Sequence, residues 1–160
     1  MNYMKPFIKW QGGKRRELKY IRTFVPDGVP TIAEPFAGGA AVAFDYECPA
    51  YLNDTNARLI NLYNVIANVD NFQRMLKDIA VLKTSTQEEL ERRYYEARAY
   101  LNHSQTFDDP YSRALAFLIL RQQCFSGMER YNSRGEFNVP WGRYKTFSCC
   151  LDEPHQRFLE

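Results

Sequence analysis

Long apolar segments are absent from this sequence of 160 residues. No run approaches the roughly 20 apolar residues that a membrane-spanning helix needs. Residues 1–9 also lack the apolar core of a secretory signal peptide. We therefore expect a cytoplasmic protein without a membrane partner.

Metal-ligating side chains are also scarce. The sequence has two histidines, His103 and His155, and four cysteines, of which only Cys149 and Cys150 are close together. Adjacent cysteines suit neither a zinc site nor a ready disulfide framework. We therefore expect no metal site and no disulfide scaffold.

Bulk disorder is excluded by composition. Apolar residues make up 45% of the chain and charged residues 25%, both near the averages of globular proteins. A chain of this length forms one ordinary domain with a substantial core.

Basic residues concentrate in two segments, although the formal net charge is only +2. Residues 5–22 carry seven basic side chains and one acidic one, and residues 121–145 carry five basic and two acidic ones. Two such segments suit a polyanion such as DNA, and a solvated basic face is the alternative explanation.

Hydrophobic spacing predicts an α/β fold in the first part of the chain. Residues 31–36 and 51–54 are typical of two short strands. Between them lie a glycine turn at residues 37–40 and a predicted helix start near Phe44. Residues 59–69 follow helical spacing. This order of elements opens a doubly wound parallel sheet.

The middle of the chain is predicted to be helical. Thr86 and Glu89 form a capping-box pattern, and Pro110 is placed at the start of another helix. Residues 125–144 instead alternate short aromatic runs with turns that contain glycine or proline, which predicts a β-hairpin or a loop excursion.

Two glycines and an acid indicate a cofactor site. Gly38 and Gly39 follow the first strand, where the backbone approaches a ligand without a Cβ in the way, and an ordinary strand-to-helix turn is the alternative. Asp54 follows the second strand, where an acid accepts hydrogen bonds from ribose hydroxyls or caps a helix. The combination favours an adenosine-containing ligand.

The excursion at residues 125–144 interleaves cations, amides and aromatics. Arginine pairs with guanine edges, amides suit adenine, and aromatics stack on bases or wedge between them. A surface hairpin with incidental aromatics is the alternative. The DNA-binding candidates are Phe125, Arg130, Asn132, Asn138, Pro140, Arg143 and Tyr144.

Four segments together resemble the Dam family (D12 class) of S-adenosylmethionine-dependent DNA adenine methyltransferases. They are residues 5–14, 34–39, 53–56 and 117–144, in the family's order. The resemblance implies a Rossmann-like methyltransferase fold with a partial sheet, S-adenosylmethionine as cofactor and double-stranded DNA as partner. The implied reaction is methyl transfer to the exocyclic amine of adenine, with GATC as the expected site.

The same resemblance divides the chain and assigns the cofactor residues. Residues 1–69 correspond to the cofactor-binding part, 70–147 to the helical and hairpin target-recognition region, and 148–160 to the start of a return to the catalytic half. Trp10 and Lys14 would close over the cofactor, with Lys14 near its carboxylate, and Asp54 would bind the ribose. The residues implied to line the methionine side are Pro35, Phe36, Gly38 and Gly39.

In the recognition region, Arg130 and Pro140 match positions that contact the recognition site in the family. Phe125 matches an aromatic residue that in the family inserts at the flipped base. The sequence departs from the family at Ser126, where asparagine is usual, and at Gln122 and Gln123, which interrupt the usual pattern.

The family's Asp-Pro-Pro-Tyr loop, which holds the target amine in line with the methyl sulfonium, is absent from these 160 residues. Asp108-Asp109-Pro110-Tyr111 is similar, but it has a single proline and no preceding strand, so we interpret it as a helix start. We therefore assign no catalytic residue here. A second chain or the missing half is expected to complete the sheet.

Two other functions stay open. One is a non-catalytic module that binds cofactor, DNA or both. The other is a nucleotide-binding protein of another class, whose glycines serve a phosphate. Gly12-Gly13-Lys14 does not support a phosphate-binding P-loop. A P-loop has four residues between its first glycine and Gly-Lys and a Ser or Thr after the lysine, whereas here the spacing differs and Arg15 follows Lys14.

Overall fold

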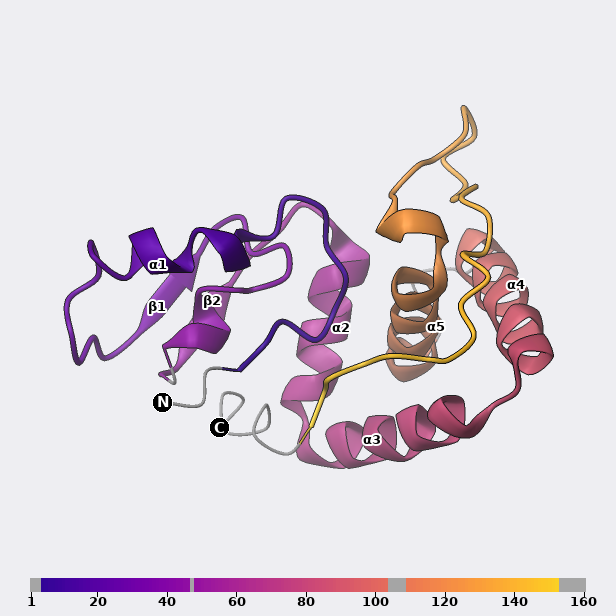
Figure 1. Cartoon of the computed structure of the whole chain (residues 1–160), viewed down its shortest axis with the longest axis horizontal. Helices are drawn as coiled ribbons and strands as arrows, with labels where there is room; N and C mark the ends of the chain where they lie inside the picture. The colour runs from indigo at the N-terminus through magenta and orange to yellow at the C-terminus, as the bar shows by residue number, and fades with distance from the viewer. Residues whose placement is uncertain (1–3, 47, 104–108, 153–160) are drawn as a thin grey trace.

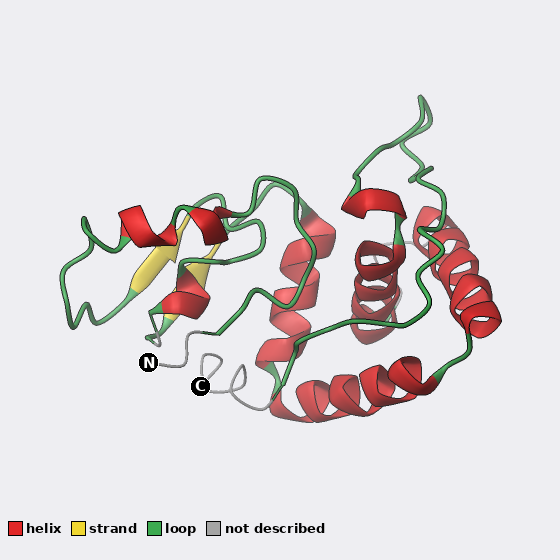
Figure 2. Cartoon of the chain, in the orientation of Figure 1, coloured by secondary structure: helices red, strands yellow, loops and turns green. Residues whose placement is uncertain are grey.

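The computed structural model describes residues 4–46, 48–103 and 109–152. The first part contains η1 (Lys14–Arg16), α1 (Leu18–Ile21), β1 (Ile32–Glu34), η2 (Ala43–Asp45) and β2 (Ala50–Leu52). The longer helices α2 (Ala57–Ala67), α3 (Val69–Thr84), α4 (Gln87–His103) and α5 (Pro110–Gln123) follow, and η3 (Phe125–Gly127) comes last. The small sheet lies at one end of the molecule and the long helices form the other (Figures 1 and 2).

The two strands confirm the α/β opening in its coarse form. β1 and β2 pair in parallel, with Ile32 opposite Ala50 and Glu34 opposite Leu52. The helix expected after the glycine turn is reduced to turns and η2. Gly38 and Ala40 have left-handed backbones, with φ of 49° and 52°, and a right-handed helix does not continue through such residues.

An apolar groove runs along β1. Within the described residues β1 pairs with β2 alone, and Phe36 beside it is 86% exposed. An unpaired strand edge offers backbone donors and acceptors to a further strand. The apolar residues that line the groove are Val25, Val29, Ile32, Ala33, Pro35, Phe36 and Val42.

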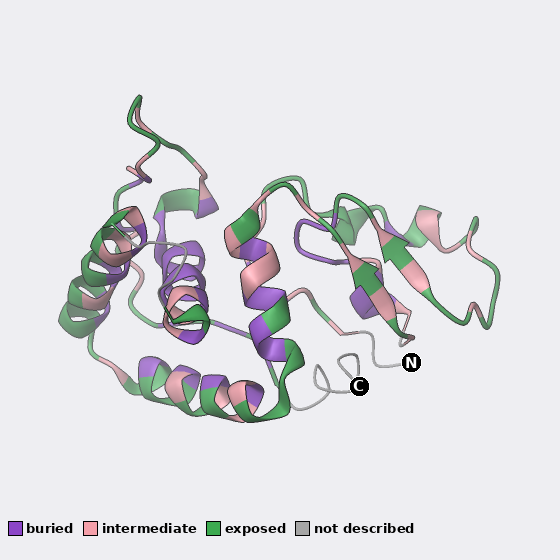
Figure 3. Ribbon diagram, turned by 180° about the vertical axis from the view of Figure 1, so that it is seen from behind, coloured by how far each residue is buried: buried purple, intermediate pink, exposed green. Residues whose placement is uncertain are grey.

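Most of the core lies among the helices. α5 packs against both α2 and α4, and the buried residues gather on α2 and α5, whereas the strands stay partly exposed (Figure 3). The N-terminal segment joins this core through Phe7, whose ring meets Phe44 and Tyr63 edge-on at 5.7 and 6.0 Å. The N-terminal segment is therefore packed on the same core as α2.

The helix starts follow their capping signals. The Glu89 N–H donates to Thr86 Oγ1 and the Thr86 N–H to Glu89 Oε2, which confirms the capping box. Asp109 caps α5 by accepting from the backbone of Tyr111 and Ser112, which confirms the helix start there; Asp108 lies outside the described residues. The helical spacing over 59–69 corresponds to α2, which ends at Ala67.

The excursion after α5 is looser than a β-hairpin. Its two arms run antiparallel but meet only at single bridges, Cys124 with Trp141 and Tyr131 with Phe137. Ser126 and Arg143 have left-handed φ values of 54° and 56°, and proline lacks the N–H that a ladder needs. These residues prevent continuous strands. The recognition excursion (residues 124–144) is held by isolated backbone hydrogen bonds, such as that from the Phe125 N–H to the Pro140 carbonyl at 2.9 Å, together with side-chain contacts.

Candidate functional site

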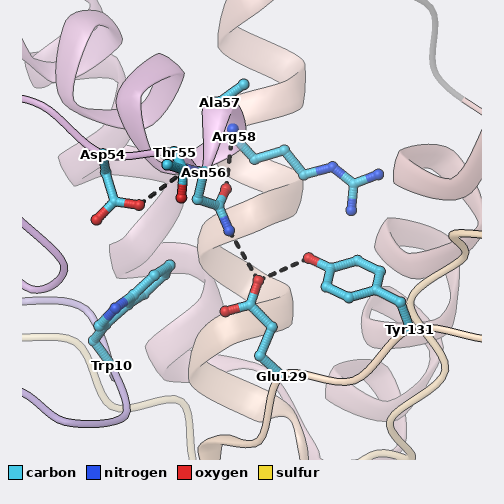
Figure 4. Close-up of a pocket in the computed structure, with 8 residues that line it drawn as sticks. All are labelled: Trp10, Asp54, Thr55, Asn56, Ala57, Arg58, Glu129 and Tyr131. Atoms are coloured by element: carbon cyan, nitrogen blue, oxygen red, sulfur yellow. Dashed lines mark hydrogen bonds between the residues drawn. The ribbon is translucent and has the colours of Figure 1, made fainter. Parts of the chain in front are cut away.

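A pocket of about 490 Å³ lies where three segments of the chain meet. Trp10 comes from the N-terminal segment and the next three residues from the turn between β2 and α2. The following two are the first residues of α2, and the last two belong to the recognition excursion (Figure 4). The lining residues are Trp10, Asp54, Thr55, Asn56, Ala57, Arg58, Glu129 and Tyr131.

Asp54 ties the glycine turn to the start of α2. Its Oδ2 accepts from the Gly38 N–H and its Oδ1 from the Asn56 N–H, both at 2.9 Å. A carboxylate offers about four acceptor positions, so Asp54 retains capacity for further donors such as ribose hydroxyls. The helix cap, the alternative role for Asp54, belongs to Asn56, whose Oδ1 accepts from the Arg58 and Leu59 N–H groups.

The backbone at Gly38 lies directly against Trp10. A Cβ at this glycine would lie 2.8 Å from Cδ1 of the indole, and its φ of 49° is left-handed. Its carbonyl accepts from the Tyr63 hydroxyl at 2.5 Å. At Gly39 a Cβ would lie 3.5 Å from Cβ of Trp10. Both glycines therefore pack beneath the tryptophan, and a larger residue at Gly38 would have to displace the indole.

The other cofactor candidates lie elsewhere. Lys14 is exposed at the start of η1, and Pro35 and Phe36 line the groove along β1 rather than the pocket. The structure thus brings Trp10, Gly38 and Asp54 together, and it does not place Lys14, Pro35 and Phe36 with them.

The exposed DNA candidates lie on the recognition excursion. Phe125, the first residue of η3, is 53% exposed, and Pro140 and Arg143 are also exposed. Arg130 pairs with Asn138 across the arms, since its Nε donates to the amide oxygen at 2.8 Å and its Nη2 to the backbone carbonyl at 3.1 Å. This pair leaves the guanidinium exposed but fixes its direction.

Asn132 has an internal role at the tip of the excursion. Its Oδ1 accepts from the Arg134 and Glu136 N–H groups, and its Nδ2 donates to Glu136 Oε2. Such an asparagine turn fixes the tip in a single shape. The side chain expected to read a base is therefore occupied in shaping the loop.

Lys9 is a functional candidate that the sequence analysis did not single out. Its Nζ donates to the carbonyl of Gln122 at 2.7 Å and lies 4.0 Å from the ring centre of Tyr144. Burial lowers the pKa of Lys9, opposed by the attraction of Cys124. The only sequence signal for it was its place in the first basic segment beside Trp10.

The two glutamines that depart from the family pattern anchor neighbouring segments. Gln122 donates from Nε2 to the carbonyl of Phe7. Gln123 accepts from Trp141 Nε1 at 3.1 Å and donates to the Thr146 carbonyl at 3.3 Å. They therefore attach α5 to the N-terminal segment and to the far arm of the excursion.

Glu129 and Tyr131 were also missed by the sequence analysis. The Tyr131 hydroxyl donates to Glu129 Oε1 at 2.8 Å. Burial, followed by this hydrogen bond, raises the pKa of Tyr131 to about 12, so the phenol stays a donor at neutral pH. The signal available was that Glu129 is one of two acids in an otherwise basic segment.

Neither a metal centre nor a membrane span is found in the part of the chain that the structure describes. Its His, Cys, Asp and Glu residues form no group of three or more that could hold an ion. None of its helices combines the length and the hydropathy required to cross a bilayer.

Several known proteins are similar to this chain in sequence. It is 41% identical over 149 residues to the type II methyltransferase M.CviBI of Paramecium bursaria Chlorella virus NC1A, and 40% identical over 147 residues to a DNA adenine methylase of Serratia marcescens. The DNA adenine methylase of Escherichia coli K12 is 39% identical over 147 residues. Each match covers 91% of this chain but only 53%, 52% and 50% of the relative.

The chain therefore spans about half the length of the curated relatives that it matches. The model of the D12 class N6 adenine-specific DNA methyltransferase family matches residues 10–157. This range contains the pocket around Asp54 and the whole recognition excursion. The chain belongs to the D12 class N6 adenine-specific DNA methyltransferase family.

Proposed function

We propose that this chain forms the cofactor-binding and DNA-binding part of a methyltransferase acting on the exocyclic amine of adenine in duplex DNA. Residues 1–69, part of a Rossmann-like sheet, would bind S-adenosylmethionine, and the region 70–147 would recognise a site such as GATC. The observation that carries the proposal is the pocket lined by Trp10 and Asp54 together with Glu129 and Tyr131 of the recognition excursion. Gly38 is tied to it by the hydrogen bond from its N–H to Asp54.

The residues of the pocket fit an adenosine-containing cofactor. Asp54 has acceptor positions left for ribose hydroxyls, and the indole of Trp10 offers an aromatic face that excludes water. The glycine turn lets the indole pack directly against the backbone, which fixes the position of that aromatic face. S-adenosylmethionine, when bound, supplies a methyl group on a sulfonium centre, and the protein's task is to orient it.

The excursion fits duplex DNA. We propose that Phe125, exposed beside the left-handed Ser126, inserts at the base stack. Arg130, held in direction by Asn138, is proposed to read a base edge. Lys9 and Tyr144 lie at the base of the same excursion, where a cation meets an aromatic ring.

Asp54→Ala is expected to weaken binding of S-adenosylhomocysteine by about tenfold or more, since hydrogen bonds to a charged group contribute about 1.5–3 kcal/mol. Calorimetric titration of the chain measures this affinity. Asp70→Ala, an exposed acid in the first turn of α3, is the matched control and should bind as the wild type does. DNA affinity without cofactor should be unchanged. Tighter binding of ATP than of S-adenosylhomocysteine would contradict the proposal.

Arg130→Ala is expected to reduce discrimination between a GATC duplex and a random duplex by about 1–3 kcal/mol. Fluorescence anisotropy at matched salt measures both affinities. Arg134→Ala, at the exposed tip where Arg134 pairs with Glu136, serves as the control and should leave discrimination intact. Equal losses on the two duplexes would make Arg130 a phosphate contact instead.

A second candidate function is a binding module without turnover. It is favoured by the absence of an Asp-Pro-Pro-Tyr motif from these 160 residues. Incubation with labelled S-adenosylmethionine and a GATC duplex separates the two functions, because the module binds both partners without transferring label to the DNA.

A further inference from the structure

A series of hydrogen bonds joins the pocket around Asp54 to the recognition excursion, and Glu129 is its central residue. Glu129 Oε1 accepts from Asn56 Nδ2 and from the Tyr131 hydroxyl, both at 2.8 Å (Figure 4). The side chain is largely buried, with 25% of it exposed. One carboxylate oxygen therefore joins the turn before α2 to the excursion.

On the cofactor side, Asn56 is linked both to Asp54 and to the start of α2. Its backbone N–H donates to Asp54 Oδ1, while Asp54 Oδ2 holds the Gly38 N–H. Its side-chain oxygen caps α2, so the amide nitrogen is directed at Glu129. A ligand that fixes the carboxylate of Asp54 therefore also fixes Asn56, whose Nδ2 donates to Glu129.

On the recognition side, Glu129 contacts two groups that shape the excursion. The ring of Tyr131 packs edge-on against Phe137 at 5.7 Å, across one of the two bridges between the arms. The second oxygen of Glu129 lies 3.8 Å from Nη1 of Arg121, which is buried and donates to the carbonyls of Gly127 and Met128. Glu129 thus contacts both the start of the excursion and its arm.

We propose that Glu129 is a positioning residue through which cofactor and duplex DNA favour each other's binding. The inference rests on the proposed function and extends it. A cofactor held by Asp54 orders Asn56 and, through Glu129, the segment that contains Tyr131. DNA then binds a segment whose ordering entropy is already lost, which gives positive cooperativity. Linkage requires the effect to be reciprocal.

The coupling factor is the dissociation constant of S-adenosylhomocysteine without DNA divided by that with a saturating GATC duplex. In the wild-type chain it is expected to be about fivefold or more. Asn56→Asp keeps an oxygen to cap α2 but replaces the donated amide with a second carboxylate facing Glu129. Its coupling factor is expected to fall to about one. Glu129→Ala breaks the same bond, leaves the α2 cap intact and should give the same result.

A reversal of the hydrogen bond provides the decisive rescue. When Asn56→Asp is combined with Glu129→Gln, the glutamine amide donates to the new carboxylate and to the tyrosine oxygen. The pair is restored with donor and acceptor exchanged, so the coupling factor should return toward the wild-type value. Because each single substitution breaks the bond and only the pair restores it, recovery of the coupling factor assigns the coupling to this bond.

Glu136→Ala is the matched control. Glu136 is a second acid of the excursion, but its side chain bonds to Asn132 and Arg134 at the tip. Its loss is expected to alter DNA affinity while the coupling factor stays at the wild-type value. Melting followed by circular dichroism confirms that each variant is folded.

The outcomes separate the two proposals. A wild-type chain that binds both ligands with a coupling factor of one overturns this inference and leaves the proposed function standing. A wild-type chain that binds no S-adenosylhomocysteine overturns both. Coupling that survives in Glu129→Ala, or that the double substitution does not restore, removes Glu129 from the role proposed here.

Discussion

Replacement of Arg22 by alanine is expected to lower the free energy of unfolding by about 3–5 kcal/mol. The carboxylate of Asp45 is 1% exposed, and its two oxygens accept from Nε and Nη2 of Arg22 at 2.7 and 2.5 Å. Without the guanidinium this bidentate pair is lost, and the carboxylate stays buried. Because the arginine itself is partly exposed, water softens the loss, and the lower end of the range is expected.

Chemical denaturation followed by circular dichroism measures this loss. Arg92→Ala is the matched control, since Arg92 forms a single exposed contact with Glu96 one turn along α4 at 2.8 Å, and such pairs contribute about 0.3–0.5 kcal/mol. Combining Arg22→Ala with Asp45→Asn should recover part of the stability, because the buried charge is then removed. Similar small losses in both arginine variants would show that the pair with Asp45 is not stabilising.

The elements predicted well from the sequence are those whose signals are local. The Thr86 and Glu89 pair specifies the start of α4 within four residues, and Asp109 with Pro110 does the same for α5. The period of apolar residues after residue 59 identified α2 because one helical face must be buried. None of these predictions required knowledge of a distant contact.

The elements predicted poorly depend on contacts made far along the chain. Ala40 is left-handed because the glycine turn is held by Asp54 and covered by Trp10, so the expected helix after it does not form. The segment after α5 was expected to be a β-hairpin or a loop excursion. It is the looser of the two, with two isolated bridges, because the left-handed Ser126 and Arg143 interrupt the ladder. A sequence pattern does not report such contacts.

The candidate site shows the same division. Trp10, Gly38 and Asp54 were predicted to act together, since each belongs to a recognisable motif. Glu129 was not, because its partner Asn56 is 73 residues away and no motif joins them. The residues that connect two binding regions are thus the hardest to predict, since their role lies in a contact and not in a pattern.

Gly38→Ala is expected to weaken binding of S-adenosylhomocysteine by more than about tenfold and to lower the free energy of unfolding by about 2–5 kcal/mol. A left-handed backbone costs about 1–2 kcal/mol for a residue with a Cβ, and overpacking costs about 1–3 kcal/mol more. The new methyl would lie 2.8 Å from the indole of Trp10. The indole would therefore have to move away from the wall of the pocket that it forms.

Gly12→Ala separates the two causes. Gly12 is also left-handed, with a φ of 72°, but no atom lies within 4 Å of its built Cβ. It should therefore show the backbone penalty of about 1–2 kcal/mol in a denaturant melt and retain cofactor affinity in calorimetry. Equal cofactor binding by the two variants would mean that Trp10 does not cover the ligand. Loss confined to Gly38→Ala would place the ligand against the indole, because only the methyl at Gly38 displaces that ring.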